Sequence, residues 1–359
     1  MPDFPWDRLA PYAERARAHP DGIVDLSVGT PVDSTPEVIR RALAAATDAP
    51  GYPLTAGSAE LRAAGAGWLA RRLGVVGLDP SAVLPTIGSK ELVALLPMLL
   101  GALPGSRVLH PRLAYPTYDV GARLAGCVPQ PCDEPPADPG GVAMVWLNSP
   151  SNPTGGVLPA ATLRDWVEWG RANDVPVVND ECYIELGWET TPTSILHPDA
   201  CGDTHSGVLA VHSLSKRSNL AGYRAGLVAG DLDLIAALLE VRKHSGLIVP
   251  APVQAAMTAA LGDDDHVTAQ RARYASRRDR LRAALATVGL RLADSTAGLY
   301  LWATRGEDCW STVDWLAEQG ILVTPGEFYG SAGARHIRVA LTVTDERVDA
   351  AVTRLNKLA

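Results

Sequence analysis

Composition and charge already exclude several classes of protein. The 359-residue chain carries 32 Lys and Arg against 40 Asp and Glu, which gives a formal net charge of −8, and 47% of its residues are hydrophobic. These values are typical of soluble globular proteins, so a mainly disordered chain is excluded. The acidic balance argues against a general nucleic-acid binder. The uncharged apolar stretch 245–262 contains two prolines, which a membrane-spanning helix rarely carries.

The N-terminus and the cysteines indicate a compartment. No basic segment followed by an apolar one opens the chain, so we expect no signal peptide. The cysteines are odd in number and include no C-x-x-C, which favours reduced thiols in the cytoplasm over a disulfide framework or a zinc site. The histidines show no metal-ligand spacing, so no metal is expected. The five cysteines are Cys127, Cys132, Cys182, Cys201 and Cys309.

Apolar runs alternate with amphipathic stretches through the first two thirds of the chain. Strands that are apolar throughout and separated by helices predict an α/β fold, with a mostly parallel sheet covered by helices on both faces. The length suggests about two domains. The predicted strands are 82–87, 107–110, 142–147, 175–178, 207–213 and 224–228, and the clearest helical patterns are 90–100, 160–173 and 232–244.

The C-terminal third has a different pattern, which predicts a smaller α+β domain. A long Arg-rich helix is expected at 263–288, followed by strands at 298–303 and 336–341 and a final helix at 345–358. The Pro-containing segment 248–252 is the expected boundary. We therefore predict a large domain over 41–249 and a small domain over 250–359, with 1–40 forming an arm and part of the small domain.

One lysine stands out in a chain that otherwise uses arginine. Four of the 32 basic residues are lysines, and Lys216 follows the apolar strand that ends at Ser213. A surface charge is the ordinary explanation for a lysine. However, an amine delivered from a strand end suits Schiff-base chemistry, for which arginine has no nucleophilic form. No G-x-G-x-x-G, P-loop, G-x-S-x-G or H-E-x-x-H motif offers a competing chemistry.

The segment around this lysine resembles a known family. Residues 213–224 (SLSKRSNLAGYR) are similar to the lysine segment of fold-type I, pyridoxal-phosphate-dependent aminotransferases. Residues 152–155 (NPTG), residues 180–183 (DECY) and Arg338 follow in the family's order and approximate spacing. The resemblance covers essentially the whole chain. It implies the aminotransferase fold, transaminase activity and pyridoxal 5′-phosphate as cofactor.

The resemblance assigns the cofactor ring to a small set of residues. Lys216 would bind the cofactor covalently, and Asp180, at a strand's carboxyl end, would keep the pyridine nitrogen protonated. Tyr183 and Asn152 would hydrogen-bond the ring's phenolic oxygen, and Tyr115 would stack on the ring. Each residue also has a structural explanation: a helix N-cap for Asp180, core packing for the two tyrosines and a turn for Asn152.

The cofactor's phosphate needs donors. Gly88, Ser89 and Lys90 follow a strand and open a helix, so their backbone N–H groups face a potential anion site. Ser213 and Arg224 would add a hydroxyl and a guanidinium. The side chain of Lys90 points either to solvent or to substrate. By resemblance, Tyr52 reaches the phosphate of a neighbouring subunit, which implies a homodimer.

Arg338 is the expected substrate anchor. An arginine among a strand's apolar residues is costly unless it is paired, and the family uses it to bind the substrate's α-carboxylate; a structural salt bridge is the alternative. Gly29 would let the backbone approach that carboxylate closely.

Further stretches resemble a narrower family, the bacterial N-succinyldiaminopimelate aminotransferases of lysine biosynthesis. The resemblance implies amino transfer between glutamate and N-succinyl-2-amino-6-oxopimelate. An aspartate- or alanine-type aminotransferase and a pyridoxal-phosphate β-lyase remain open. A cofactor-sensing regulator is disfavoured, because no basic helix-turn-helix pattern is present. The stretches are 4–7, 25–33, 87–92, 113–121 and 249–254.

Overall fold

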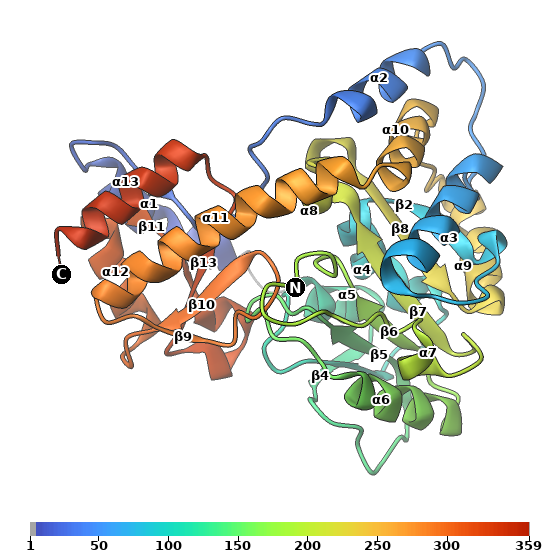
Figure 1. Ribbon diagram of the computed structural model, residues 1–359. Helices are drawn as coiled ribbons and strands as arrows, with labels where there is room; N and C mark the ends of the chain where they lie inside the picture. The colour runs from blue at the N-terminus through green and yellow to red at the C-terminus, as the bar shows by residue number, and fades with distance from the viewer. Residues whose placement is uncertain (1–4, 359) are drawn as a thin grey trace.

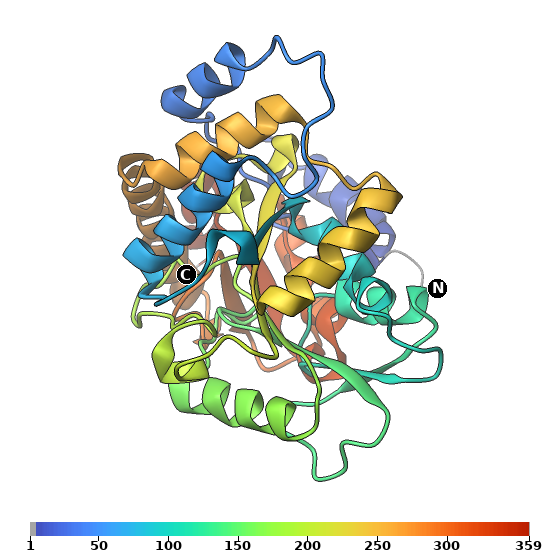
Figure 2. The same ribbon diagram turned by 90° about the vertical axis from the view of Figure 1, so that its right-hand side faces the viewer.

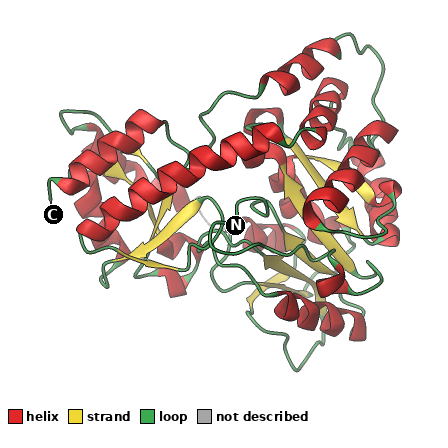
Figure 3. Ribbon diagram, viewed as in Figure 1, coloured by secondary structure: helices red, strands yellow, loops and turns green. Residues whose placement is uncertain are grey.

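The computed structural model of the chain describes residues 5–358. Figure 1 shows two parts: one contains strands β2 to β8, the other contains β9 to β13, and the long helix α11 (Asp265–Thr287) runs from one to the other. Figure 3 shows the strands of the first part lying among helices. The α/β class and the smaller α+β part that the sequence predicted are confirmed.

The large part is built on a seven-stranded sheet with the order β2-β8-β7-β6-β5-β3-β4. β8 runs antiparallel to both of its neighbours, and the other four pairings are parallel, which confirms a mostly parallel sheet. The strands are β2 (Val83–Ile87), β3 (Arg107–His110), β4 (Val128–Pro131), β5 (Val142–Asn148), β6 (Val177–Asp180), β7 (Val208–Ser213) and β8 (Ala225–Gly230).

Helices cover both faces of this sheet because successive strand residues point to opposite sides. Leu147 and Val177 belong to one apolar cluster, whereas Trp146 and Val178 belong to another. The first cluster is completed by α3 (Ala59–Leu73), α6 (Ala160–Ala172) and α10 (Ala251–Gly262). The second is completed by α4 (Gly88–Leu99), α5 (Thr117–Leu124) and α9 (Leu232–Ser245).

Helix ends are marked by capping residues that are visible in the sequence. Ser58 is the N-cap of α3, and its hydroxyl accepts from Leu61 N; Gly74 follows the helix in the left-handed conformation. Asp231 is the N-cap of α9 and accepts from two backbone N–H groups, and left-handed Gly246 follows that helix. Both follow the usual pattern of a polar N-cap and a glycine at the C-terminus.

The small part has two sheets and its own apolar cluster. A four-stranded antiparallel sheet has the order β12-β13-β10-β9, and β1 pairs in parallel with β11. Its strands are β1 (Val24–Asp25), β9 (Arg291–Ala293), β10 (Tyr300–Thr304), β11 (Ile321–Leu322), β12 (Thr324–Pro325) and β13 (Ile337–Ala340), and the helices beside α11 are α1 (Ala10–Arg17), α12 (Cys309–Glu318) and α13 (Asp345–Asn356).

The packing suggests a division of the chain different from the expected one at 249/250. α10 follows that boundary, yet its Met257 and Leu261 are buried in a cluster of the large sheet. α2 (Glu37–Ala45) contacts α10, and the two lie side by side in Figure 2. By contrast, residues of α1 and β1 pack in the small part. We therefore propose that the second boundary lies near 263, after α10.

The remaining elements are short, and two of them differ from expectation. β6 extends to Asp180, two residues beyond the expected strand, and Arg224 lies just before β8 in the left-handed conformation instead of opening it. No described helix is long and apolar enough to cross a membrane. The short helices are α7 (Pro198–Cys201), α8 (Leu214–Arg217), η1 (Pro5–Leu9), η2 (Pro80–Ala82), η3 (Ala221–Tyr223), η4 (Gly326–Tyr329) and η5 (Ser331–Gly333).

Candidate active site

A cavity of about 740 Å³ is lined by residues from both parts of the molecule. β5 and β6 end at Asn148 and Asp180 on its wall, and Lys216 follows the end of β7. Parallel strands place their carboxyl ends at one edge of a sheet, which is where α/β proteins bind ligands. Of the predicted site residues, ten line this cavity: Gly29, Ser89, Lys90, Tyr115, Asn152, Asp180, Tyr183, Lys216, Arg224 and Arg338.

Asp180 is a buried carboxylate with an unusual set of partners. Its Oδ2 accepts a hydrogen bond from Tyr118 Oη at 2.8 Å, and its Oδ1 accepts from Cys182 N at 3.1 Å. It is 6% exposed and forms no ion pair with any described residue. A buried carboxylate is costly without a cation. The protonated nitrogen of a bound heterocycle would supply that cation.

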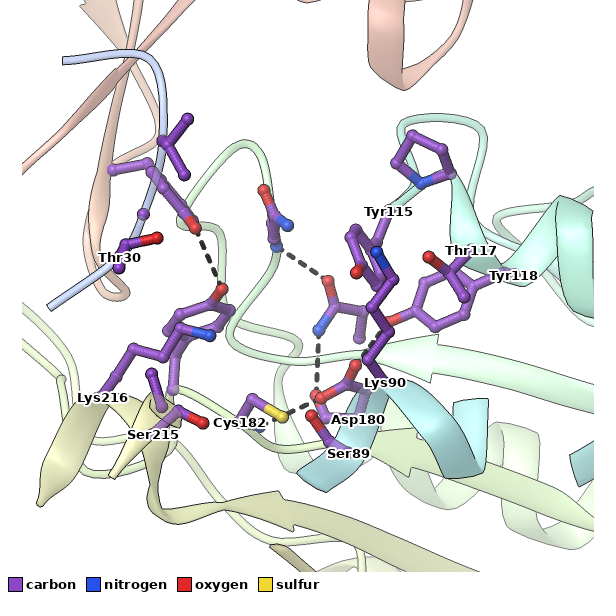
Figure 4. Close-up of a pocket in the computed structure, with 18 of the residues that line it drawn as sticks. Thr30, Ser89, Lys90, Tyr115, Thr117, Tyr118, Asp180, Cys182, Ser215 and Lys216 are labelled. Carbon is purple, nitrogen blue, oxygen red and sulfur yellow. Dashed lines mark hydrogen bonds between the residues drawn. The ribbon is translucent and has the colours of Figure 1, made fainter. Parts of the chain in front are cut away.

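Lys216 reaches the cavity from the four-residue helix α8. Ser213, the last residue of β7, caps this helix by accepting a hydrogen bond from Ser215 N at 3.1 Å. The ammonium nitrogen lies 5.9 Å from the ring centroid of Tyr183. Figure 4 shows Lys216 and Asp180 in the wall of the same pocket. The strand end thus delivers an amine to the edge where the carboxylate lies.

The start of α4 has the groups that an anion would require. Gly88 has a φ of +68°, and a Cβ there would lie 2.5 Å from Arg224 Nη2, so glycine gives the guanidinium access to the helix N-terminus. Arg224 is held in turn by a 2.8 Å hydrogen bond from its Nη1 to Ala221 O. Ser89 and Arg224 both line the cavity. Helix N–H groups, a hydroxyl and a guanidinium together fit a phosphate.

Arg338, on β13, is 3% exposed. Its Nη1 donates to Asn152 Oδ1 at 2.9 Å and its Nη2 donates to Ser27 O at 2.7 Å. The alternative of a structural salt bridge does not apply, because Arg338 has no carboxylate partner in residues 5–358. Gly29 lies close by, and a Cβ at that position would collide with Tyr300 Oη. Position 29 therefore requires glycine, because the Tyr300 hydroxyl leaves no room for a side chain.

The cavity has a marked excess of positive charge. Four cations line it, namely Lys90, Lys216, Arg224 and Arg338, and none forms an ion pair with a described carboxylate. Asp180 is the one acidic residue among the described lining residues. Unpaired cations at this density need anionic ligands. The site is therefore suited to a ligand, or a pair of ligands, that carries several negative charges.

Three predicted residues do not line the cavity. Gly88 lies behind Arg224, and the Ser213 hydroxyl is engaged in capping α8. Tyr52 is 99% exposed. Gly88 and Ser213 contact the lining residues Arg224 and Ser215, whereas Tyr52 contributes nothing to the cavity of its own chain.

Sequence reasoning missed three residues that structure the site. Tyr118 holds Asp180, and Tyr300 lies 3.2 Å, oxygen to oxygen, from Tyr183. Asn148 accepts from Asn152 N at 2.7 Å and donates to Asp180 O at 2.9 Å. Tyr118 lies within the stretch 113–121 that the sequence had singled out, whereas Asn148 lies between the predicted strand 142–147 and the motif 152–155.

A second buried group lies behind the strand ends. Glu181 accepts hydrogen bonds from Asn179 Nδ2 at 3.0 Å and Ile195 N at 2.7 Å, and its Oε2 lies 3.6 Å from His212 Nε2. Burial raises the pKa of Glu181 to about 8. Burial, helped by the nearby Arg217, lowers the pKa of His212 to about 3. Both side chains are therefore neutral near pH 7.

This pair makes the stability depend on pH. Native Glu181 keeps a proton that an unfolded chain, with a pKa near 4.5, releases, so its contribution falls as pH rises towards 8. Above pH 6.5 His212 is neutral in both the folded and the unfolded chain, so it does not change the stability further. Between pH 6.5 and 8 we expect the titration of Glu181 to lower the free energy of unfolding by about 2 kcal/mol, at ~1.4 kcal/mol per pH unit. Thermal melts from pH 6.5 to 8 should show the loss in the wild type but not in Glu181→Gln. Parallel curves for the two proteins would contradict the assignment.

Comparisons with known proteins agree with this geometry. The family model described as aminotransferase class I and II matches residues 21–355. The chain is 60% identical over 358 residues to the 4-dedimethylamino-4-oxo-anhydrotetracycline transaminase OxyQ of Streptomyces rimosus, covering 99% of each chain. It is also 60% identical over 356 residues to a probable aminotransferase of Mycobacterium tuberculosis, covering 99% of this chain and 85% of the relative. The structure of N-succinyldiaminopimelate aminotransferase from M. tuberculosis superposes with a TM-score of 0.84 at 29% identity, covering 100% of both chains.

The fold and the cavity define an enzyme that binds an anionic heterocycle beside a lysine. The chain belongs to the class I and II aminotransferases, which depend on pyridoxal phosphate. The cofactor predicted from the sequence is thereby confirmed. When bound, pyridoxal phosphate acts as an electron sink for the amino acid's Cα. The cavity residues fit this group: Asp180 suits its ring nitrogen, and the α4 N-terminus with Arg224 suits its phosphate.

Proposed function

We propose that the enzyme moves an amino group between glutamate or 2-oxoglutarate and N-succinyl-diaminopimelate or N-succinyl-2-amino-6-oxopimelate. The observation that carries the proposal is the fourth unpaired cation. Lys216 is taken by the cofactor, Arg224 by its phosphate and Arg338 by the substrate's α-carboxylate. Lys90 remains, so a substrate with a second carboxylate suits the cavity.

The surroundings of Lys90 support this role. Lys90 lies in the first turn of α4, and Figure 4 shows its side chain in the same part of the pocket as Tyr115. Ala94 and Val120, from α4 and α5, line the cavity too. Both glutamate and the succinylated substrate carry a carboxylate far from the reacting carbon, and one flexible ammonium can serve both lengths.

The experiment measures kcat/KM in the reverse direction, with 2-oxoglutarate as acceptor. Succinylated diaminopimelate is compared with alanine, aspartate and aromatic donors in the wild type and in Lys90→Met, which keeps most of the length of the side chain and removes its charge. We expect the wild type to prefer the succinylated donor, and Lys90→Met to lower its kcat/KM by about tenfold while changing alanine by less than about twofold. A simple amino acid that exceeds the succinylated donor by about tenfold would overturn the proposed substrate.

A second candidate rests on the 60% identity to the Streptomyces rimosus enzyme over nearly the whole of both chains. Here the acceptor would be the ketone of a 4-oxo-anhydrotetracycline. The same assay, with glutamate as donor and this ketone as acceptor, separates the two candidates. Release of pyruvate and thiol from a cysteine conjugate would instead indicate a β-lyase.

We further propose a cytoplasmic homodimer. Tyr52 is 99% exposed, Leu54 is 67% exposed, and both lie on the segment between α2 and α3. An aromatic side chain so far out of its own cavity suits a role in a partner's phosphate site. The free state of all five cysteines fits a reducing compartment.

A further inference from the structure

Tyr300 occupies a position that joins three predicted site residues. It is the first residue of β10, is 4% exposed and lines the cavity. Its hydroxyl oxygen lies 3.2 Å from Tyr183 Oη and takes up the space that a side chain at Gly29 would need. Its ring centroid lies 3.9 Å from Arg338 Cζ. Tyr300 thus contacts both a predicted cofactor ligand and the predicted carboxylate anchor.

The sheet register explains the contact with Arg338. In the antiparallel pair β10–β13, Trp302 lies opposite Arg338, so Tyr300, two residues earlier, is the diagonal neighbour of Arg338 on the same face. A buried guanidinium over an aromatic ring is attracted by the ring's negative face. The ring of Tyr300 therefore supports the guanidinium without using either of the Arg338 hydrogen bonds to Asn152 and Ser27.

The hydroxyl of Tyr300 acts on Tyr183 and not on Arg338. A phenol has one proton, so a Tyr183 hydroxyl that donates to a bound cofactor must accept from its other neighbour. The other neighbour is Tyr300 Oη. Burial raises the pKa of Tyr183 well above its usual range, so it keeps its proton for donation. A donor that is itself hydrogen-bonded becomes a stronger donor.

We propose that Tyr300 is a positioning residue with two separable parts: its hydroxyl directs the proton of Tyr183 to the cofactor's ring oxygen, and its ring holds Arg338 for the substrate's α-carboxylate. This inference rests on the family's cofactor, not on the identity of the acceptor. The two parts act through different groups, so different substitutions separate them.

The test compares Tyr300→Phe with Tyr300→Leu. Tyr300→Phe removes the hydroxyl and keeps the ring. We expect the pH midpoint of the bound cofactor's absorbance to rise by about half a unit, since a weaker hydrogen bond favours the ring oxygen's anionic form less. KM for glutamate should stay within about twofold. Tyr300→Leu should shift the midpoint likewise and also raise KM for glutamate about tenfold, with a smaller change in kcat.

Tyr329→Phe is the matched control. The Tyr329 ring also faces Arg338, with the centroid 5.0 Å from Cζ, but its buried hydroxyl makes no hydrogen bond to Tyr183. The absorbance midpoint should not move in this variant. An unchanged midpoint in Tyr300→Phe overturns the role of the hydroxyl. Equal KM values in Tyr300→Phe and Tyr300→Leu overturn the role of the ring. The absorbance titration needs no substrate, so it stands even if the proposed acceptor is wrong.

Discussion

Lys216→Ala should abolish transamination, with a loss of at least about 10⁴-fold in kcat, the upper range for a positioned proton-transfer group. The substitution would remove both the amine that we propose binds the cofactor and the base that would carry the proton at the substrate's Cα. Among the described residues, Lys90 is the one other lysine that lines the cavity. Steady-state assays with glutamate and 2-oxoglutarate measure the loss.

The attachment site is tested directly by borohydride, which makes the lysine–cofactor bond permanent before peptide mapping. We expect one labelled peptide, containing Lys216. Lys243→Ala is the control, since this lysine is 47% exposed in its side chain and pairs with Glu240 on the surface; full activity is expected. A label on Lys90 or Lys243 would show that the assigned lysine is wrong.

Asp180→Asn should lower activity about 100-fold while the protein still folds. The amide keeps an oxygen to accept from Tyr118 Oη but carries no charge to hold a protonated ring nitrogen. A paired charge is worth roughly two pKa units, and each unit is tenfold in equilibrium. Activity should be measured with thermal stability and cofactor content, so that a loss of chemistry is distinguished from a loss of fold.

Tyr118→Phe provides the comparison for Asp180→Asn. It removes the 2.8 Å hydrogen bond to the carboxylate and leaves the charge in place. We expect less than about a tenfold loss, because one neutral donor is worth less than the whole charge. If Tyr118→Phe were as damaging as Asp180→Asn, or if Asp180→Asn stayed within twofold of wild type, the charge of Asp180 would not be the active feature.

The sequence predicted the strands of the large sheet well because they are apolar on both faces. β4 was missed: it is a partly exposed edge strand with prolines at 129 and 131, which is not a strand pattern. The direction of β8 was not predictable either, since an apolar run reads the same in both orientations. The proline at 250 suggested a domain boundary before α10, whereas Met257 and Leu261 of α10 are buried in an apolar cluster of the large sheet.

For the site, residues at strand ends were the predictable ones. Asp180 and Lys216 each follow an apolar run, and the fold brings such positions to one edge. Tyr300 could not be identified, because a tyrosine within a strand reads as core until the register with β13 places it beside Arg338. The side-chain direction of Lys90 depends on packing between α4 and α5, which a single sequence does not encode.

The sheet order has a consequence for how the chain acquires its structure. β2 pairs with β8, so Val83 can pair with Ala229 only after 146 further residues have been synthesised. The delay is longer for β1, because Val24 pairs with Ile321. At about 5–20 residues per second, β2 spends roughly 7 to 30 seconds on the ribosome without its partner strand. Such delayed pairing favours slow folding and intermolecular contacts. Expression at reduced temperature, with chaperones in excess, should therefore raise the soluble yield.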